Sequence, residues 1–285
     1  MKLKQLLSIG LLFSNLVLFA QNDIYQSDKL KKVWDTKGLN VPESVMPVYD
    51  KGILYVSNVG SNNPAAKEKN GFISVLNVDG SIKNLEWCSD LDSPKGMGLY
   101  NGFLYVTEVD KISKIDTKTG EKVKSFPVNG ATFLNDIAVN KDGILYITDS
   151  GTGTVYKLEN DTVSVLIKSD EFPSPNGIIE VNGKLYVGTG DKVIAIVPET
   201  LQVEDYLLNT GGVDGLVMAE PDVFLFSNWA GKIFLMKKGG EKELLLDTSS
   251  TKNSKTADFG YITKLKRIYV PTFFGNSVVC YEVKY

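Results

Sequence analysis

Six polar residues occupy the same place in six copies of a repeated sequence segment. Each copy contains a short apolar run with tyrosine or leucine near its centre, such as ILYVSN at 53–58 and ILYITD at 144–149. Aligning the copies on that central position brings into register Glu43, Lys95, Asn135, Asn176, Asp214 and Asp258. Carboxylates and side-chain amides supply the oxygen ligands that hard cations prefer. If folding brings them together, the set favours calcium over magnesium, which requires a tighter octahedral arrangement.

Lys95 departs from this pattern of acids and amides. It lies in SPKGMGLYNG at 93–102, which matches SPNGIIEVNG at 174–183, where Asn176 takes its place. Glu43, Asp214 and Asp258 contribute −3, and Lys95 leaves −2. Two interpretations remain open. The ammonium forms an ion pair and occupies the place of a cation, or it binds a substrate carboxylate or stabilises an oxyanion.

A second group of side chains lies at or just after the ends of the repeated apolar runs. We expect these residues to bind or enclose a substrate. They are Asn58, Glu108, Asp149, Asn228, Trp229, Phe273 and Phe274.

The repeat itself predicts the fold. The central positions are Tyr55, Tyr105, Tyr146, Tyr186, Leu225 and Tyr269, which by subtraction lie 50, 41, 40, 39 and 44 residues apart. Six units of roughly forty residues are typical of a β-propeller. Each unit contains four short runs rich in Val, Ile, Tyr and Thr, separated by turns of Gly, Asn and Asp, as four-stranded blades require. We therefore predict an all-β, six-bladed propeller; a β-sandwich would not explain six matched units.

The ends of the chain indicate how the ring closes. The last unit starts at Ala257 and supplies only three strands, whereas LKKVWDTKG at 30–38 is a spare strand near the N-terminus. We predict that this strand completes the last blade, so that residues 21–285 form one domain.

Propeller geometry brings the polar residues together. The first strand of each blade lines the central channel, and the second runs antiparallel to it. The start of the first strand and the end of the second therefore open on one face.

Several of these segments resemble a known family. PESVMP, LNDIAV, SPNGI and VDGLV are similar to the metal-site segments of the gluconolactonase/regucalcin-like proteins and the related paraoxonases. The resemblance implies a calcium ion on the channel axis and hydrolysis of lactones or phosphotriesters. It implies metal binding by Glu43, Asn135, Asn176 and Asp214.

The resemblance also implies a mechanism. Asp214 matches the family's general base, and Asp258 lies at the analogous place in the sixth unit. We expect one of them to take a proton from the attacking water, and calcium to polarise the lactone carbonyl. The paraoxonase-like branch has a histidine where this chain has Lys95, and this sequence contains no histidine. A histidine-dependent mechanism is therefore excluded, as is a Ser-His-Asp triad.

The remaining sequence features concern location and partners. Residues 1–20 combine Lys2 and Lys4 with an apolar run ending at Ala20, which predicts a signal peptide and a periplasmic or secreted protein.

A net charge of −3 gives no indication of nucleic-acid binding. We expect a monomer acting on a small molecule away from the membrane. An oxidising compartment permits a disulfide between Cys88 and Cys280, but the sequence favours two buried or idle thiols.

A non-catalytic binding propeller, similar to the NHL-repeat type, is the alternative. Such a scaffold does not need acids and amides at matching channel positions, so the six polar residues favour an enzyme.

Overall fold

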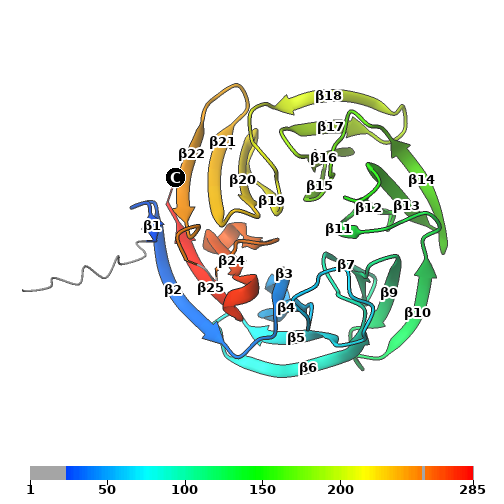
Figure 1. Ribbon diagram of the computed structural model, residues 1–285, viewed down its shortest axis with the longest axis horizontal. Helices are drawn as coiled ribbons and strands as arrows, with labels where there is room; N and C mark the ends of the chain where they lie inside the picture. The colour runs from blue at the N-terminus through cyan, green and yellow to red at the C-terminus, as the bar shows by residue number, and fades with distance from the viewer. Residues whose placement is uncertain (1–23, 252–253, 285) are drawn as a thin grey trace, which may run out of the picture.

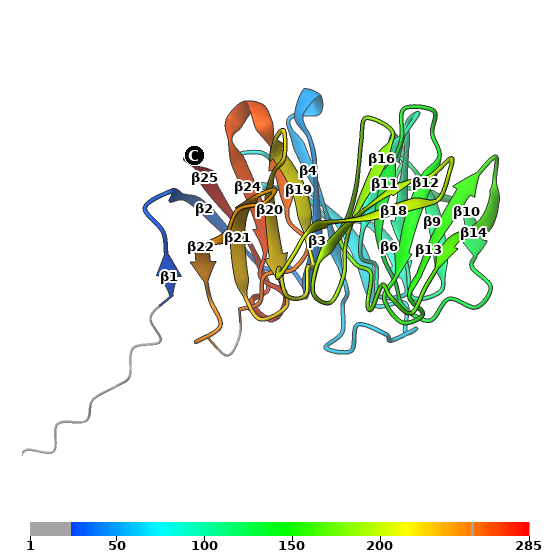
Figure 2. The ribbon, with the colours of Figure 1, turned by 90° about the horizontal axis from the view of Figure 1, so that it is seen from above.

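The computed structural model describes residues 24–251 and 254–284, and these form a six-bladed β-propeller (Figure 1). Six antiparallel sheets surround a central channel, and Figure 2 shows the ring edge-on. The predicted all-β class and blade number are confirmed. In the described part of the chain the only helices are three short 3-10 turns, Tyr49–Lys51, Thr263–Leu265 and Phe273–Gly275. No helix there is long and apolar enough to cross a membrane.

The blades follow one another in chain order, each running from the channel outwards. Their strands are β3 (Pro42–Val48), β4 (Ile53–Asn58), β5 (Gly71–Asn77) and β6 (Ile82–Leu91) in blade 1; β7 (Met97–Tyr100), β8 (Phe103–Thr107), β9 (Lys111–Asp116) and β10 (Lys122–Pro127) in blade 2; β11 (Leu134–Val139), β12 (Leu145–Asp149), β13 (Thr154–Glu159) and β14 (Thr162–Lys168) in blade 3; β15 (Ile178–Val181), β16 (Lys184–Gly188), β17 (Val193–Val197) and β18 (Gln202–Leu207) in blade 4; β19 (Leu216–Glu220), β20 (Val223–Asn228), β21 (Lys232–Lys237) and β22 (Lys242–Asp247) in blade 5; and β23 (Gly260–Ile262), β24 (Arg267–Pro271) and β25 (Ser277–Val283) in blade 6.

The N-terminal strand closes the ring as predicted. Strand β2 (Leu30–Lys37) pairs with β25 from Leu30 opposite Val283 to Lys37 opposite Ser277. The structure adds one strand that the sequence did not reveal. Strand β1 (Tyr25–Gln26) pairs with β22 and gives blade 5 a fifth strand. The segment from β1 to β2 therefore joins blades 5 and 6 (Figure 1).

Tight turns join the first and second strands of blades 2 and 4. Asn101 and Gly102 have φ of 47° and 81°, and Asn182 and Gly183 have φ of 53° and 81°. Two successive positive φ values favour Asn-Gly. This explains why the two similar segments both end in Asn-Gly.

The core lies between neighbouring blades. Tyr55 of blade 1, for example, packs in one cluster with Met97, Leu104 and Val106 of blade 2. The repeated tyrosine therefore joins each sheet to its neighbour by burying apolar surface, at roughly 25 cal/mol per Å². Cys88 and Cys280 are free, buried and in different clusters, so they do not form a disulfide. The predicted signal peptide lies outside the described residues.

Candidate active site in the central channel

The six aligned polar residues, here called the inner ring, lie where the innermost strands begin. Lys95, Asn176, Asp214 and Asp258 each come two residues before their strand. In blade 1 the pairing passes from Pro42 opposite Asn58 to Ser44 opposite Ser57, so Glu43 lies in a β-bulge. A similar register shift between Leu134 and Ile137 contains Asn135. Bulges redirect side chains away from the sheet. Glu43 and Asn135 lie inside their strands, and the bulges explain how they take the same place in the ring as the four residues that come just before their strands.

Close contact between neighbouring blades explains the glycine that follows the ring residue in the two similar segments. A Cβ atom on Gly177 would lie 2.1 Å from the carbonyl oxygen of Asp214, and one on Gly96 would lie 2.5 Å from Cα of Asp136. Only glycine permits this approach. The backbone of the inner ring is therefore held directly against the next blade.

Most of the inner ring faces one cavity at the centre of the propeller. Its volume is about 190 Å³. The predicted site residues that line it are Glu43, Lys95, Asn135, Asn176, Asp214, Trp229 and Phe273. The lining residues that the sequence analysis missed are Pro64, Phe133, Ser150 and Ser174. Phe133 and Ser174 lie just before inner-ring residues, but an apolar or hydroxyl side chain gave no chemical signal in the alignment.

The carboxylates of this region are buried, and their pKa values rise as a result. Burial raises the pKa of Asp214 to about 7, although a hydrogen bond from Asn176 opposes the shift. Burial, reinforced by Asp214 and Asp136, raises the pKa of Glu43 well above its usual value, and Lys95 partly opposes this. Burial also raises the pKa of Asp136 to about 7. The channel therefore concentrates negative charge that binds protons or cations strongly.

Two oxygen atoms in the cavity have no hydrogen-bond donor. Glu43 Oε2 and Asn176 Oδ1 are buried and accept no hydrogen bond from the described residues. The Asn176 amide is oriented by its nitrogen, which donates to Asp214 Oδ1 at 3.0 Å. Asn135 is held similarly, with Nδ2 donating to Ser150 Oγ at 3.2 Å. Because buried acceptors are rarely left unpaired, these oxygens indicate a binding site.

Lys95 is buried in the same cavity, with only 1% of its surface exposed. Its Nζ donates to the carbonyl oxygen of Ser93 at 3.1 Å and lies 4.4 Å from the centre of the Phe133 ring. No carboxylate lies within 4 Å of it in the described part of the chain. Burial lowers the pKa of Lys95 to about 8, although the more distant Glu43 and Glu108 raise it. Lys95 thus lines the cavity with an ammonium that makes one hydrogen bond for three donors.

Asp258 and Asp136 lie beside the cavity but do not line it. Asp258 accepts a hydrogen bond from Ser44 Oγ, and its backbone N–H donates to the carbonyl oxygen of Glu43 at 3.0 Å. Burial, with Asp136 and Glu43 nearby, raises the pKa of Asp258 well above its usual value. Asp136 accepts from the backbone N–H groups of Ile137 and Ile178 at 2.8 and 3.3 Å. Of the two acids expected as general base, only Asp214 lines the cavity.

Three of the residues expected to bind substrate are instead engaged with the scaffold. Asn58 accepts from the backbone of Asn40 at 3.0 Å and donates to Ser74 Oγ at 3.0 Å. Glu108 accepts from Ser113 Oγ and the backbone of Asp92, and pairs with Lys111 at 3.2 Å.

Asp149 is engaged in the same way. It accepts hydrogen bonds from the backbone N–H groups of Thr132, Phe133 and Gly151 and from Thr152 Oγ1, at 2.8–3.1 Å. None of the three lines the central cavity.

The matching residue in the other blades is also bonded to its own turn. Asn228 Oδ1 accepts from the backbone of Lys232 at 3.2 Å, Thr189 Oγ1 donates to the carbonyl of Lys192 at 2.9 Å, and Thr272 Oγ1 to that of Ser277 at 3.0 Å. We call these six residues the strand-end set: Asn58, Glu108, Asp149, Thr189, Asn228 and Thr272.

Three aromatic rings form one wall of the site. Trp229 meets Phe273 edge-to-face at 4.7 Å between ring centres, and Phe273 meets Phe274 at 4.8 Å. Trp229 and Phe273 line the cavity, whereas Phe274 supports them from behind. Trp229 is 45% exposed and therefore lies at the rim.

The donor atoms fit a hard cation. Among the described residues, no three His, Cys, Asp or Glu side chains lie close enough together to hold a metal ion, so amide oxygens would have to complete the coordination. Glu43, Asn135, Asn176 and Asp214 provide two carboxylates and two amides around one cavity, and two of their oxygens lack donors. Oxygen donors of this kind suit calcium.

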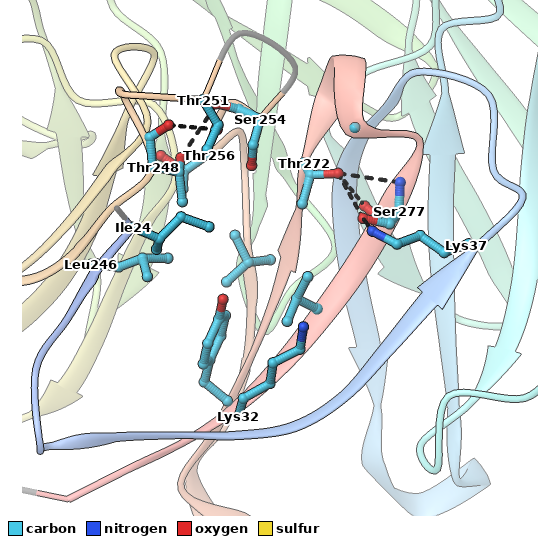
Figure 3. A pocket seen from close by; sticks show the side chains of 14 residues that line it. Ile24, Lys32, Lys37, Leu246, Thr248, Thr251, Ser254, Thr256, Thr272 and Ser277 are labelled. Carbon is cyan, nitrogen blue, oxygen red and sulfur yellow. Dashed lines mark hydrogen bonds between the residues drawn. The ribbon is translucent and has the colours of Figure 1, made fainter. Parts of the chain in front are cut away.

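A second large pocket, between blades 5 and 6, shows the opposite arrangement (Figure 3). Most of its hydroxyl groups bond to each other or to nearby backbone, as Thr272 and Ser277 do at 2.8 Å. Its two lysines, Lys32 and Lys37, both pair with Asp35. In the described part of the chain, no buried polar atom without a hydrogen-bond partner belongs to a residue that lines this pocket.

Comparison with known proteins confirms the fold. No known family model and no curated protein matches the sequence. A candidate gluconolactonase superposes with a TM-score of 0.65 at 16% identity, covering 90% of this chain and 92% of its own. A streptogramin B lyase gives 0.63 at 14%, covering 92% and 98%. A catalytically inactive histidine-to-alanine variant of virginiamycin B lyase from Staphylococcus aureus, solved with quinupristin, gives 0.59 at 15%, covering 90% and 100%. The expected likeness to gluconolactonase-type six-bladed propellers is thus confirmed at the level of fold.

Proposed function

We propose that this chain is a calcium-dependent hydrolase that opens a lactone or a related ester in the central cavity. The observation that carries the proposal is the set of polar atoms that share this cavity. One cavity brings together the carboxylate of Asp214, the buried ammonium of Lys95, and one oxygen each of Glu43 and Asn176 that has no donor among the described residues.

Glu43, Asn135, Asn176 and Asp214 would hold the cation. When bound, it would act as a Lewis acid on the ester carbonyl. It would also lower the pKa of Asp214, because a nearby positive charge favours the carboxylate.

Asp214 acts as the general base. Its carboxylate takes a proton from the attacking water as the water oxygen bonds to the carbonyl carbon. The C–O bond of the ester then breaks, and the leaving alkoxide takes that proton from Asp214, which gives a hydroxy acid and restores the Asp214 carboxylate. Asn176 orients Asp214 through the 3.0 Å hydrogen bond.

Lys95 stabilises the oxyanion that forms on the carbonyl oxygen. Its ammonium is held by one hydrogen bond and by the face of Phe133, so two N–H donors remain for the reacting group. Such a donor, already in place in the cavity, strengthens its interaction as negative charge develops.

A lyase mechanism of the virginiamycin B type has less support. That enzyme is described as inactive when one histidine is replaced by alanine, and this chain contains no histidine. We therefore assign hydrolysis rather than elimination.

A panel of lactones and simple esters, assayed with calcium and after chelation, tests the proposal. We expect turnover that chelation abolishes and calcium restores, and Asp214→Asn should be inactive. If no substrate is turned over, or if Asp214→Asn equals the wild type, the propeller is a non-catalytic binding module.

We also propose export from the cytoplasm, supported by the N-terminal sequence. Expression of the full chain in a bacterium, followed by N-terminal sequencing of the mature protein, should give a chain beginning at Gln21. An intact N-terminus in the cytosolic fraction would contradict this.

A further inference from the structure

A second pocket adjoins the central cavity between blades 4 and 5. Its volume is about 290 Å³. It shares four lining residues with the central cavity: Ser174, Asn176, Asp214 and Trp229. The other residues that line it are Thr189, Gly190, Gly212, Val213, Asn228 and Ala230. The two pockets therefore form one continuous site, and Trp229 stands between them.

The chemistry of this outer pocket differs from that of the centre. No lysine or arginine lines it, and its one charged group is Asp214, so it does not favour an anionic ligand. The remaining polar groups are hydroxyls, amides and the exposed backbone of two glycines. Trp229 offers a half-exposed ring that Phe273 fixes edge-to-face at 4.7 Å. A flat apolar face among neutral hydrogen-bonding groups suits a ligand with C–H faces and hydroxyls.

We propose that the outer pocket binds a sugar residue attached to the lactone or ester that reacts in the central cavity. The substrate is thus a glycosylated lactone or ester rather than a small, isolated ring. This inference rests on the proposed hydrolase function, because the reacting group must occupy the central cavity. Trp229 stacks on the sugar, and Ser174, the amide nitrogen of Asn228 and the exposed backbone of Gly190 and Gly212 bind its hydroxyl groups.

Gly212 offers a way to fill the outer pocket alone. Its φ is not positive, and a Cβ atom there would have the carbonyl oxygen of Gly190, at 3.8 Å, as its only near neighbour. The neighbouring Gly211 has a φ of +73° and would be strained by any side chain. Gly212→Val therefore adds bulk in the pocket without disturbing the backbone. Ala230→Leu, at an exposed residue of the same pocket, is an independent second variant.

The test compares glucono-δ-lactone with lactobionolactone, the same lactone carrying a galactosyl group. In the wild type we expect kcat/KM to be roughly tenfold higher for lactobionolactone, because remote binding energy contributes to catalysis. In Gly212→Val and Ala230→Leu this ratio should fall to about one. Ala65→Val, which adds similar bulk at an exposed position outside the pocket, should keep the wild-type ratio. Melting temperatures establish that each variant is folded.

A binding measurement separates this inference from the hydrolase proposal. Lactobionate, which cannot be hydrolysed as a lactone, is titrated calorimetrically into the wild type and both pocket variants. If it binds and the variants weaken it, but neither lactone is turned over, the outer pocket stands and the hydrolase proposal fails. Equal kcat/KM for the two lactones in the wild type, an unchanged ratio in both variants, or no binding of lactobionate together with no turnover would overturn the outer pocket.

Discussion

The inner ring and the strand-end set contain similar residue types, but they differ in whether their buried polar atoms have hydrogen-bond partners. Both consist mainly of acids and amides that recur once per blade, and both are almost entirely buried. The strand-end residues use their polar atoms in hydrogen bonds with the surrounding turns and strands. Asp149, for example, accepts hydrogen bonds from four donors. In the inner ring, Glu43 Oε2 and Asn176 Oδ1 have no donor among the described residues, and Lys95 has one acceptor there for three N–H groups.

This contrast shows how to separate a site from its scaffold. A buried polar group stabilises a fold when its hydrogen bonds are made, and it destabilises the fold when they are not. The strand-end set therefore stabilises the blades. The inner ring leaves polar atoms free at a cost in stability, and it does so where the cavity could hold a ligand.

The largest effect should come from Asp214→Asn. The change is nearly isosteric but removes the proton acceptor, so we expect kcat for lactone hydrolysis to fall by about 10²- to 10⁴-fold. The melting temperature should stay equal or rise, because a buried charge is removed. Steady-state kinetics and thermal unfolding measure both. A kcat within a factor of about ten of the wild type would remove Asp214 from the base role.

Lys95→Met should have the next largest effect. It keeps an unbranched chain only one atom shorter but removes the ammonium, and we expect kcat to fall about 10²-fold, the effect of losing one oxyanion donor. KM should change less, because the interaction forms in the transition state. If Lys95 serves only to balance the negative charge of Glu43, kcat will be unchanged, and that outcome would support the ion-pair interpretation.

Asn58→Ala tests the other side of the comparison. It removes three hydrogen bonds, with Asn40, Val56 and Ser74, and should lower the free energy of unfolding by about 1–3 kcal/mol. Because Asn58 does not line the cavity, kcat/KM should stay within about twofold of the wild type. Denaturant unfolding and kinetics provide the two readouts. A loss of activity without a loss of stability would assign Asn58 to the substrate, as the sequence predicted.

The smallest effect that we expect is the change in stability with pH, measured on the protein after a chelator has removed calcium. The folded state raises the pKa of Asp136 and Asp214 from a usual 3.8 to about 7, so it holds their protons more tightly than the unfolded chain. Stability should therefore fall as pH rises from about 4 to about 7. It should rise again above about 8, because burial lowers the pKa of Lys95 to about 8 in the folded state only.

Melting temperatures across this pH range should thus pass through a minimum near neutral pH. Calcium should flatten the fall, because it stabilises the carboxylates. A stability that increases steadily from pH 4 to pH 7 after chelation would contradict the assigned environment of both acids.

The sequence predicted the fold well because the repeat is strong. Tyr55 and its counterparts fixed the number of blades, and the missing strand of the last blade indicated closure by residues 30–37. Strand β1 was not predicted, because two residues, Tyr25 and Gln26, carry no pattern. The inner ring could be aligned because its position relative to the repeated tyrosine is nearly constant.

The sequence separated the inner ring from the strand-end set by position, but it could not show which of the two has polar atoms left to bind a ligand. Asn58 and Asn176 carry the same amide at different positions of the repeat, and their hydrogen-bond partners show that Asn58 is engaged with the scaffold. Those partners, such as Asn40 for Asn58 and Asp214 for Asn176, come from other turns or other blades. The cavity residues Pro64 and Phe133 were missed for a similar reason, since their role depends on where loops meet in space.

Calorimetric titration of calcium into the chelated protein tests the central claim most directly, namely that the unpaired oxygens of the inner ring serve a cation. We predict binding of one calcium ion per chain in the wild type and in Asn58→Ala. Glu43→Gln, which replaces one carboxylate oxygen by an amide nitrogen, should weaken binding by at least about tenfold. Absence of calcium binding in the wild type, or equal affinity in Glu43→Gln, would contradict the account.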